Sequence, residues 1–126
     1  MITEDYVSFE VAKLLKEKGF NEKCVAYYPQ CITPIKLTFG GRVNYNSSNK
    51  FKMLPPISAP THQMTMAWLR EKNISIEPSV VKPHYWVYTI YEILNNKVKE
   101  LYNDGGFDSY KKAVEAALKY VLKNLI

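Results

Sequence analysis

The chain has 126 residues, of which 47% are hydrophobic and 23% are charged, and its formal net charge at pH 7 is +5. These values are typical of one folded globular domain, and they exclude a mainly disordered, fibrous or coiled-coil protein. The positive excess is spread along the chain, whereas a nucleic-acid-binding protein usually concentrates it on one face or stripe. We expect a single domain over residues 1–126.

The first predicted element is a helix over residues 8–18. Its apolar residues recur at the spacing of one helix face, and Ser8 is suited to cap its first turn. Gly19 can end the helix in the left-handed conformation, and Phe20 can then fold back onto Leu15.

Two short strands and a long loop are predicted next. Residues 24–28 form an apolar run ended by Pro29, and residues 35–39 alternate apolar and polar side chains until Gly40-Gly41. Residues 40–57 are rich in Gly, Asn, Ser and Pro, so they predict a long loop, with room for a short strand near its start.

The second predicted helix opens at residues 58–60, because Pro60 fits the first turn, where its missing N–H is not needed. Ile74 and Ile76 begin a strand that Pro78 is expected to interrupt.

The third quarter of the chain carries the strongest strand signal, over residues 85–93, followed by a turn at Asn95-Asn96. Residues 98–102 are compatible with a further strand or with a helical turn, and residues 104–106 predict a loop. A last helix is expected from Ser109 to Leu125, with an alanine-rich first half suited to close packing on a sheet.

The resulting order is α-β-β-loop-α-β-β-(β)-α. It predicts an α+β domain with about three helices packed on a mainly antiparallel sheet.

Aromatic residues occupy both faces of the strand over residues 85–93, and two interpretations follow. Either helices or a loop cover both faces, or one face stays open as a contact surface for a protein partner or a second copy of the chain, since Tyr and Trp are enriched at interfaces. The candidate protein-contact surface consists of Tyr85, Trp86, Tyr88 and Tyr91.

A small nucleic-acid-binding module, for RNA or DNA, is the alternative. Cations alternate with aromatic residues in the predicted loop, where they could pair with phosphates and stack on bases. Residues 58–126 also follow the element order of the double-stranded-RNA-binding domain and loosely resemble its second helix, although the spacing of that family's lysines and alanines is not kept. The candidate nucleic-acid contacts are Arg42, Tyr45, Lys50, Phe51, Lys52, Lys111 and Lys112.

Catalytic, metal and cofactor sites are weakly supported. His62 and His84 lack a flanking motif that would orient them, and a helical histidine such as His62 is expected at the surface or near a cap. Cys24 and Cys31 do not have the spacing of a standard zinc half-site. We therefore expect a protein that is not an enzyme and that binds no metal or cofactor.

The location expected from sequence is the cytoplasm. The first residues show no basic start followed by an apolar stretch, and no apolar run approaches the ~18 residues that a membrane span needs.

Three segments together resemble a known family. They are VSFEVAKLLKEKGF at 7–20, SAPTHQM at 58–64 leading to WLRE at 68–71, and Ser109-Tyr110 leading to Ala113, Ala116-Ala117, Tyr120 and the final NLI. In this order they resemble a family of small uncharacterised proteins of gut anaerobic bacteria and of their phages or other mobile elements. The resemblance implies a cytoplasmic accessory protein, often associated with mobile DNA, and it implies no catalytic residue. Together with the residues above, it favours a non-enzymatic binding protein that acts through protein contacts.

Overall fold

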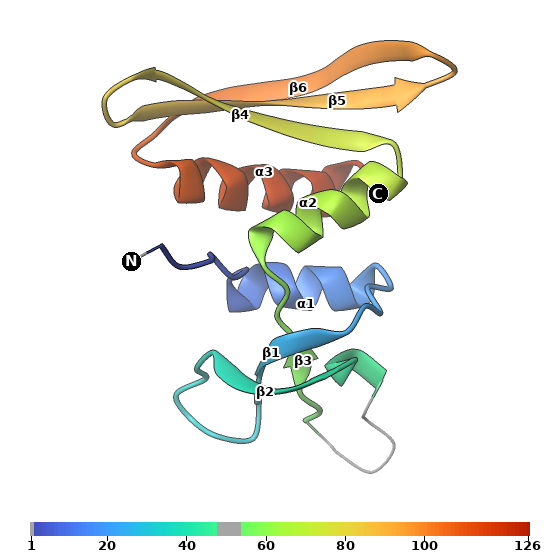
Figure 1. Ribbon diagram of the computed structural model, residues 1–126, viewed down its shortest axis with the longest axis vertical. Helices are drawn as coiled ribbons and strands as arrows, with labels where there is room; N and C mark the ends of the chain where they lie inside the picture. Colours follow the sequence, from blue (N-terminus) through green and yellow to red (C-terminus); the bar gives the residue numbers. More distant parts are fainter. Residues whose placement is uncertain (1, 48–53) are drawn as a thin grey trace. The chain divides into compact units, whose positions relative to one another are not determined.

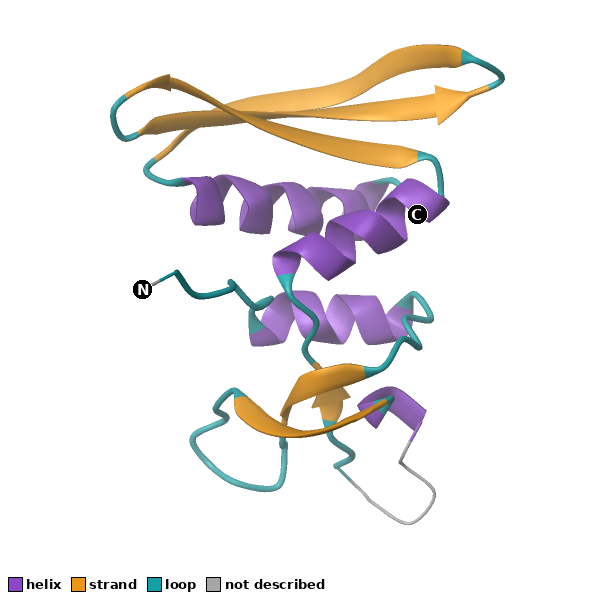
Figure 2. Ribbon diagram, viewed as in Figure 1, coloured by secondary structure: helices purple, strands orange, loops and turns teal. Residues whose placement is uncertain are grey.

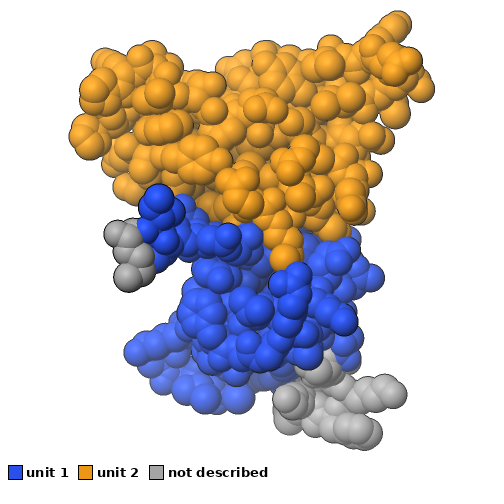
Figure 3. Space-filling view, viewed as in Figure 1, with its two compact units in different colours: residues 1–61, 126 blue, residues 62–125 orange. Residues whose placement is uncertain are grey.

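The computed structural model describes residues 2–47 and 54–126 and confirms the α+β class. The chain forms two compact units, the first made of residues 1–61 with Ile126 and the second of residues 62–125 (Figure 3). Each unit combines helix with one three-stranded antiparallel sheet. The strands are therefore divided between two sheets, a division that the linear order of elements does not reveal.

Helix α1, Phe9–Glu17, confirms the first predicted helix. The Ser8 side chain accepts a hydrogen bond from the backbone N–H of Val11 at 3.2 Å, which satisfies one of the free donors of the first turn. Gly19 has a φ of +87°, and the Phe20 N–H then donates to the Leu15 carbonyl at 3.0 Å. This left-handed ending is the one for which glycine is favoured.

The sheet of the first unit has the order β2-β1-β3, with β1 at Cys24–Tyr28, β2 at Thr38–Val43 and β3 at Ile57–Ser58. Cys24, Ala26 and Tyr28 alternate with more exposed neighbours and enter the core. The Tyr28 hydroxyl donates to the Val7 carbonyl at 2.7 Å, so this core tyrosine has its polar group satisfied.

Two boundaries in the first unit differ from the sequence prediction. Strand β2 begins at Thr38 and continues through Gly40-Gly41 instead of ending there. The Tyr45 hydroxyl lies over Gly40, 2.6 Å from where a Cβ would be. Glycine at this position therefore leaves space for the Tyr45 side chain and does not form a turn. Tyr45 belongs to the short 3-10 helix η1, Tyr45–Ser47.

The second helix starts later than predicted. Residues 57–58 form strand β3, and the Ser58 N–H donates to the Asn46 side-chain oxygen at 2.9 Å. Pairing with β1 therefore removes Ser58 from the expected start of the helix, and helix α2 runs over His62–Glu71.

The second unit follows the order α2-β4-β5-β6-α3. Its sheet pairs β5 with both neighbours, and Figures 1 and 2 show both helices on the same face of this sheet. The remaining elements are β4 at Ile74–Lys82, β5 at Tyr85–Leu94, β6 at Lys97–Phe107 and α3 at Tyr110–Asn124.

The hairpins of this sheet are closed by residues with positive φ. Asn95 and Asn96 have φ values of +54° and +61°, the conformation that a two-residue hairpin turn requires and that asparagine tolerates. This confirms the predicted turn. The third strand is also present, and it extends through residues 104–106, which were expected to be a loop. Pro78 does not end β4, because β4 is an edge strand, where proline is tolerated.

Helix α3 supplies much of the second unit's core. Ser109 caps it by accepting a hydrogen bond from the Lys112 N–H at 3.2 Å. Its buried stripe includes two alanines of the predicted alanine-rich first half, and these small side chains allow the helix to lie close to the sheet. The stripe consists of Ala113, Val114, Ala117, Leu118, Val121 and Leu122.

Candidate protein-contact surface

Strand β5 has two faces with different surroundings. Ile90 is fully buried, Tyr88 is 2% exposed, and the Trp86 ring makes an edge-to-face contact with Tyr110 of α3 at 5.5 Å between centroids. These even-numbered residues point to the helices and define the inner face of the sheet. The four residues of the predicted contact surface therefore lie on two different faces. Trp86 and Tyr88 pack in the core, and Tyr85 and Tyr91 lie on the opposite, outer face.

The outer face carries a single apolar row along β5, with polar residues on either side. The row contains half-buried and exposed side chains, with Tyr85 at 39% and Ile93 at 46% exposure, and Val98 of β6 extends it at 66%. Both helices of this unit lie against the inner face, so they do not cover this row. We call it the β5 row: Tyr85, Val87, Thr89, Tyr91 and Ile93.

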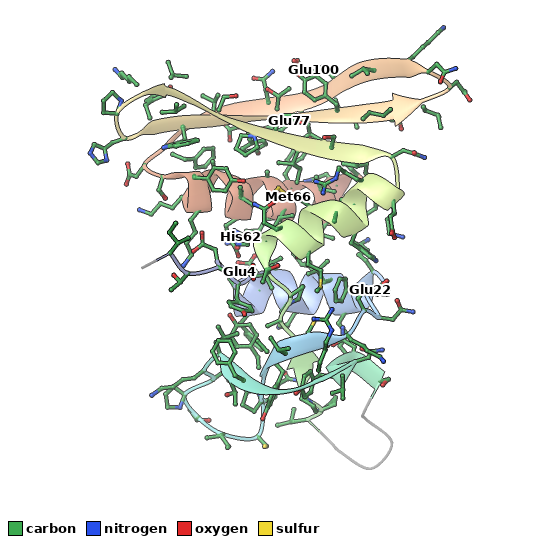
Figure 4. The ribbon with its side chains drawn as sticks, viewed as in Figure 1. Glu4, Glu22, His62, Met66, Glu77 and Glu100 are labelled. Atoms are coloured by element: carbon green, nitrogen blue, oxygen red, sulfur yellow. The ribbon has the colours of Figure 1, made fainter. Side chains whose placement is uncertain are left out.

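Two carboxylates flank the centre of the β5 row. Glu77 of β4 is directly opposite Thr89, and Glu100 of β6 is directly opposite Tyr91. Both glutamates are exposed and are labelled on the sheet in Figure 4. Their positions follow from the strand register, which sequence alone did not supply, so neither was identified as a candidate.

Neighbouring polar groups hold both carboxylates. Ser75 donates to a Glu77 carboxylate oxygen at 2.9 Å, and the Asn103 side-chain amide donates to Glu100 at 3.1 Å. Each donor lies on the same face as its acceptor. These hydrogen bonds hold the two carboxylates beside the β5 row.

One end of the β5 row is built around a glycine. A Cβ at Gly105 would lie 2.7 Å from a Val87 methyl and 3.8 Å from the Tyr85 ring, so both side chains lie over the bare backbone of β6. The Lys82 ammonium is 5.5 Å from the centre of the same Tyr85 ring, within the range of a cation–π contact.

The inner face contains an aromatic cluster between β5, β6 and α3. Tyr102 and Tyr120 stack with their ring centroids 3.8 Å apart. The rings of Tyr88 and Phe107 also stack, with 5.6 Å between their centroids. Burial, with smaller contributions from Asp104, Tyr102 and Tyr120, raises the pKa of the Tyr88 phenol to about 12. The cluster is a core feature, and Tyr88 is held there in its neutral form.

His62 is the first residue of α2, near the cap as expected, and it is buried rather than at the surface. Its Nε2 is 2.7 Å from a carboxylate oxygen of Glu115 on α3, and the ring is 2% exposed. The other ring nitrogen, Nδ1, is buried without a hydrogen-bond partner in the described structure. The pair links the start of α2 to the middle of α3. In the sequence, both residues fall in predicted helices, and this is the one feature that could have suggested a contact between them.

The loop-based nucleic-acid candidates are only partly described. Arg42 is exposed on β2, and Tyr45 stacks on Tyr27 with ring centroids 4.4 Å apart. The Tyr45 hydroxyl also donates to the Gly41 carbonyl at 2.5 Å, so its ring is held against the sheet. Lys50, Phe51 and Lys52 lie outside the described residues.

The other two nucleic-acid candidates begin helix α3. Lys111 and Lys112 are both exposed, and the Lys112 ammonium is 3.1 Å from the Asp108 carboxylate. The link from β6 to α3 and the β4–β5 turn lie at the same end of the sheet, because Trp86 pairs with Phe107. Lys82 therefore shares this end with the two α3 lysines.

The cysteines do not form a disulfide. Cys24 is buried and Cys31 is exposed, and both are free thiols. Burial raises the pKa of the Cys24 thiol to about 11, despite a hydrogen bond with Ser58 and the nearby Arg42 charge, which act in the opposite direction.

Across residues 2–47 and 54–126, no three His, Cys, Asp or Glu side chains are grouped so that they could hold a metal ion. In the same part of the chain, no helix has both the length and the apolar character to cross a membrane.

Comparison of the chain with protein-family models, with curated proteins and with solved structures finds no match.

Proposed function

We propose that the protein is a non-enzymatic binding protein that acts through protein contacts made by the outer face of the β4–β5–β6 sheet. The observation that carries the proposal is the placement of both helices on the inner face, which leaves the β5 row partly exposed. Tyrosine is suited to such a surface because it combines a large apolar ring with a polar group. The partner is another protein or a second copy of the chain.

The resemblance to proteins of gut anaerobes and their mobile elements supports an accessory role associated with mobile DNA. The free Cys24 and Cys31 thiols fit a reducing compartment, so the proposal includes a cytoplasmic location. The His62–Glu115 pair is a buried link between helices, and the proposal gives it no catalytic role.

The test is affinity capture from the native host with three forms of the protein. Thr89→Lys places a charge in the centre of the β5 row, and Thr38→Lys places the same charge at a half-buried position of strand β2 in the first unit. We expect a partner that is retained by the wild type and by Thr38→Lys and is lost with Thr89→Lys, while circular dichroism shows all three folded. If every retained protein is also retained by folded Thr89→Lys, the proposal is wrong.

A nucleic-acid-binding module is the second candidate, and a specific observation favours it. The second unit has the complete helix–strand–strand–strand–helix order of the double-stranded-RNA-binding domain, with Lys82, Lys111 and Lys112 at one end. Contacts of this kind weaken steeply with salt. We expect binding to an RNA or DNA duplex in 50 mM salt that is lost in Lys111→Glu/Lys112→Glu; no retention of either duplex by the wild type would eliminate this candidate.

A further inference from the structure

Both edges of the β4–β5–β6 sheet carry features that disfavour strand addition, so the face of this sheet is better suited than its edges to bind a partner. Pro78 removes a backbone donor from edge strand β4. Strand β6, the other edge, contains two register irregularities, opposite Trp86/Val87 and opposite Ile90/Tyr91. Prolines and bulges are devices that prevent an edge from pairing with another strand.

The outer face has a charge pattern that differs from that of the whole chain. The protein carries a net charge of +5, yet among the described residues the centre of this face has Glu77 and Glu100 on either side of the row. Its cation, Lys82, is at one end and lies over Tyr85. The face therefore favours an apolar partner surface that is flanked by positive charge.

This pattern argues against a second copy of the chain as the occupant. Two outer faces packed together would bring the carboxylates of one copy toward those of the other, and like charges at an interface are unfavourable. An acidic partner is disfavoured for the same reason.

The dimensions of the row fit one helix. Eight residue steps from Tyr85 to Ile93 span about 27 Å at the rise of a β-strand. A helix covers that length in about 18 residues. An amphipathic helix presents one apolar stripe with polar residues on both sides, which matches a single apolar row better than a sheet with several rows would.

We infer that the outer face binds an amphipathic helix of a partner protein whose apolar stripe lies along the β5 row and whose flanking Lys or Arg side chains pair with Glu77 and Glu100. This inference rests on the proposed function and specifies the chemistry of its partner.

The experiment uses two 18-residue helical peptides with the same leucine stripe, one flanked by lysines and one by glutamates. Their dissociation constants for the full chain are measured by calorimetry in 50 mM salt, and the contact residues are mapped by NMR. We expect the lysine peptide to bind about tenfold more tightly, with shifts centred on Val87, Thr89 and Tyr91. At 0.5 M salt the difference should shrink, because exposed charges are then screened.

The carboxylates are tested separately. Glu77→Gln and Glu100→Gln should each weaken the lysine peptide about two- to fourfold, the size of one exposed ion pair. Glu71→Gln on α2 changes the net charge equally and is the matched control, with no expected change.

Three results would overturn the inference: equal affinity for both peptides, shifts outside the outer face, or a dimer of the chain that Thr89→Lys dissociates. If the peptides fail while capture of the host partner still depends on Thr89, the partner chemistry is wrong and the proposed function stands. If host capture is independent of Thr89, the proposed function itself fails.

Discussion

The two faces of strand β5 differ although their residues alternate along one segment and are equally aromatic. On the inner face, Tyr88 and Ile90 are buried against helices, so their apolar character contributes to folding. On the outer face, Tyr85 and Ile93 stay partly exposed beside fixed carboxylates. An aromatic residue in a strand therefore indicates function only once the covered face is known. The comparison predicts that equal chemical changes on the two faces have unequal consequences.

The largest effect is expected on the inner face. Ile90→Ala removes three methyl or methylene groups from a fully buried side chain, and such changes cost about 2–5 kcal/mol of unfolding free energy. Denaturant unfolding followed by circular dichroism measures the change. A loss under about 1 kcal/mol would show that the inner face is loosely packed.

The next effect concerns the link between the helices that cover the inner face. Glu115→Ala removes the carboxylate from His62, whose other ring nitrogen already lacks a partner. Leaving a buried polar group unsatisfied costs about 1–3 kcal/mol. We expect a loss of about 2 kcal/mol in the same unfolding assay, and a smaller loss in Glu115→Gln, whose amide oxygen can still accept a hydrogen bond.

Alkaline pH should destabilise the inner face through Tyr88. Its folded-state pKa of about 12 lies above the ordinary value of 10, so the neutral phenol stabilises the fold. That stability is fully present below pH 10 and is lost as the pH rises through about 12, a change of roughly 2 kcal/mol. Unfolding measured from pH 9 to 12 should show this loss, and Tyr88→Phe should remove this part of the pH dependence.

Gly105 provides a test on the outer face. A Cβ there would lie 2.7 Å from a Val87 methyl, so Gly105→Ala should cost about 1–2 kcal/mol through crowding. The double variant Gly105→Ala/Val87→Ala should recover part of that cost, because the smaller side chain frees the space. Additive losses in the double variant would contradict the contact.

The smallest effect is expected where the outer face is most exposed. Val98→Thr keeps the side-chain shape at a position that is 66% exposed, and surface changes of this kind are usually within about 0.5 kcal/mol. Thermal and denaturant unfolding should be nearly unchanged. A loss above 1 kcal/mol would mean that Val98 is needed for folding rather than available for contact.

Features that depend on neighbours in sequence were predictable from it. The cap at Ser8, the helix end at Gly19 and the Asn95-Asn96 turn each follow from the conformational preference of one or two residues. The class of the fold and the three helices follow from periodic apolar patterns.

Features that depend on distant residues were not predictable. The sequence around Gly40 predicts a strand end because it does not show that Tyr45 lies over this glycine, and Ser58 is predicted at a helix start because the sequence does not show that β3 pairs with β1. The carboxylates beside the β5 row require the register of two strand pairs, which bulges and turns shift by single residues. The burial of His62 against Glu115 could be predicted only from the way α2 and α3 pack together.

The edges of the second sheet have a consequence for behaviour at high concentration. Fibril growth requires strands that add to one another through unbroken rows of backbone donors and acceptors. Pro78 on one edge and the two irregularities of β6 on the other interrupt those rows. The tyrosine-rich strand, which has the composition of an aggregation-prone segment, lies between them in the centre of the sheet. The second sheet thus leaves an apolar row exposed on its outer face while its edges are protected against polymerisation.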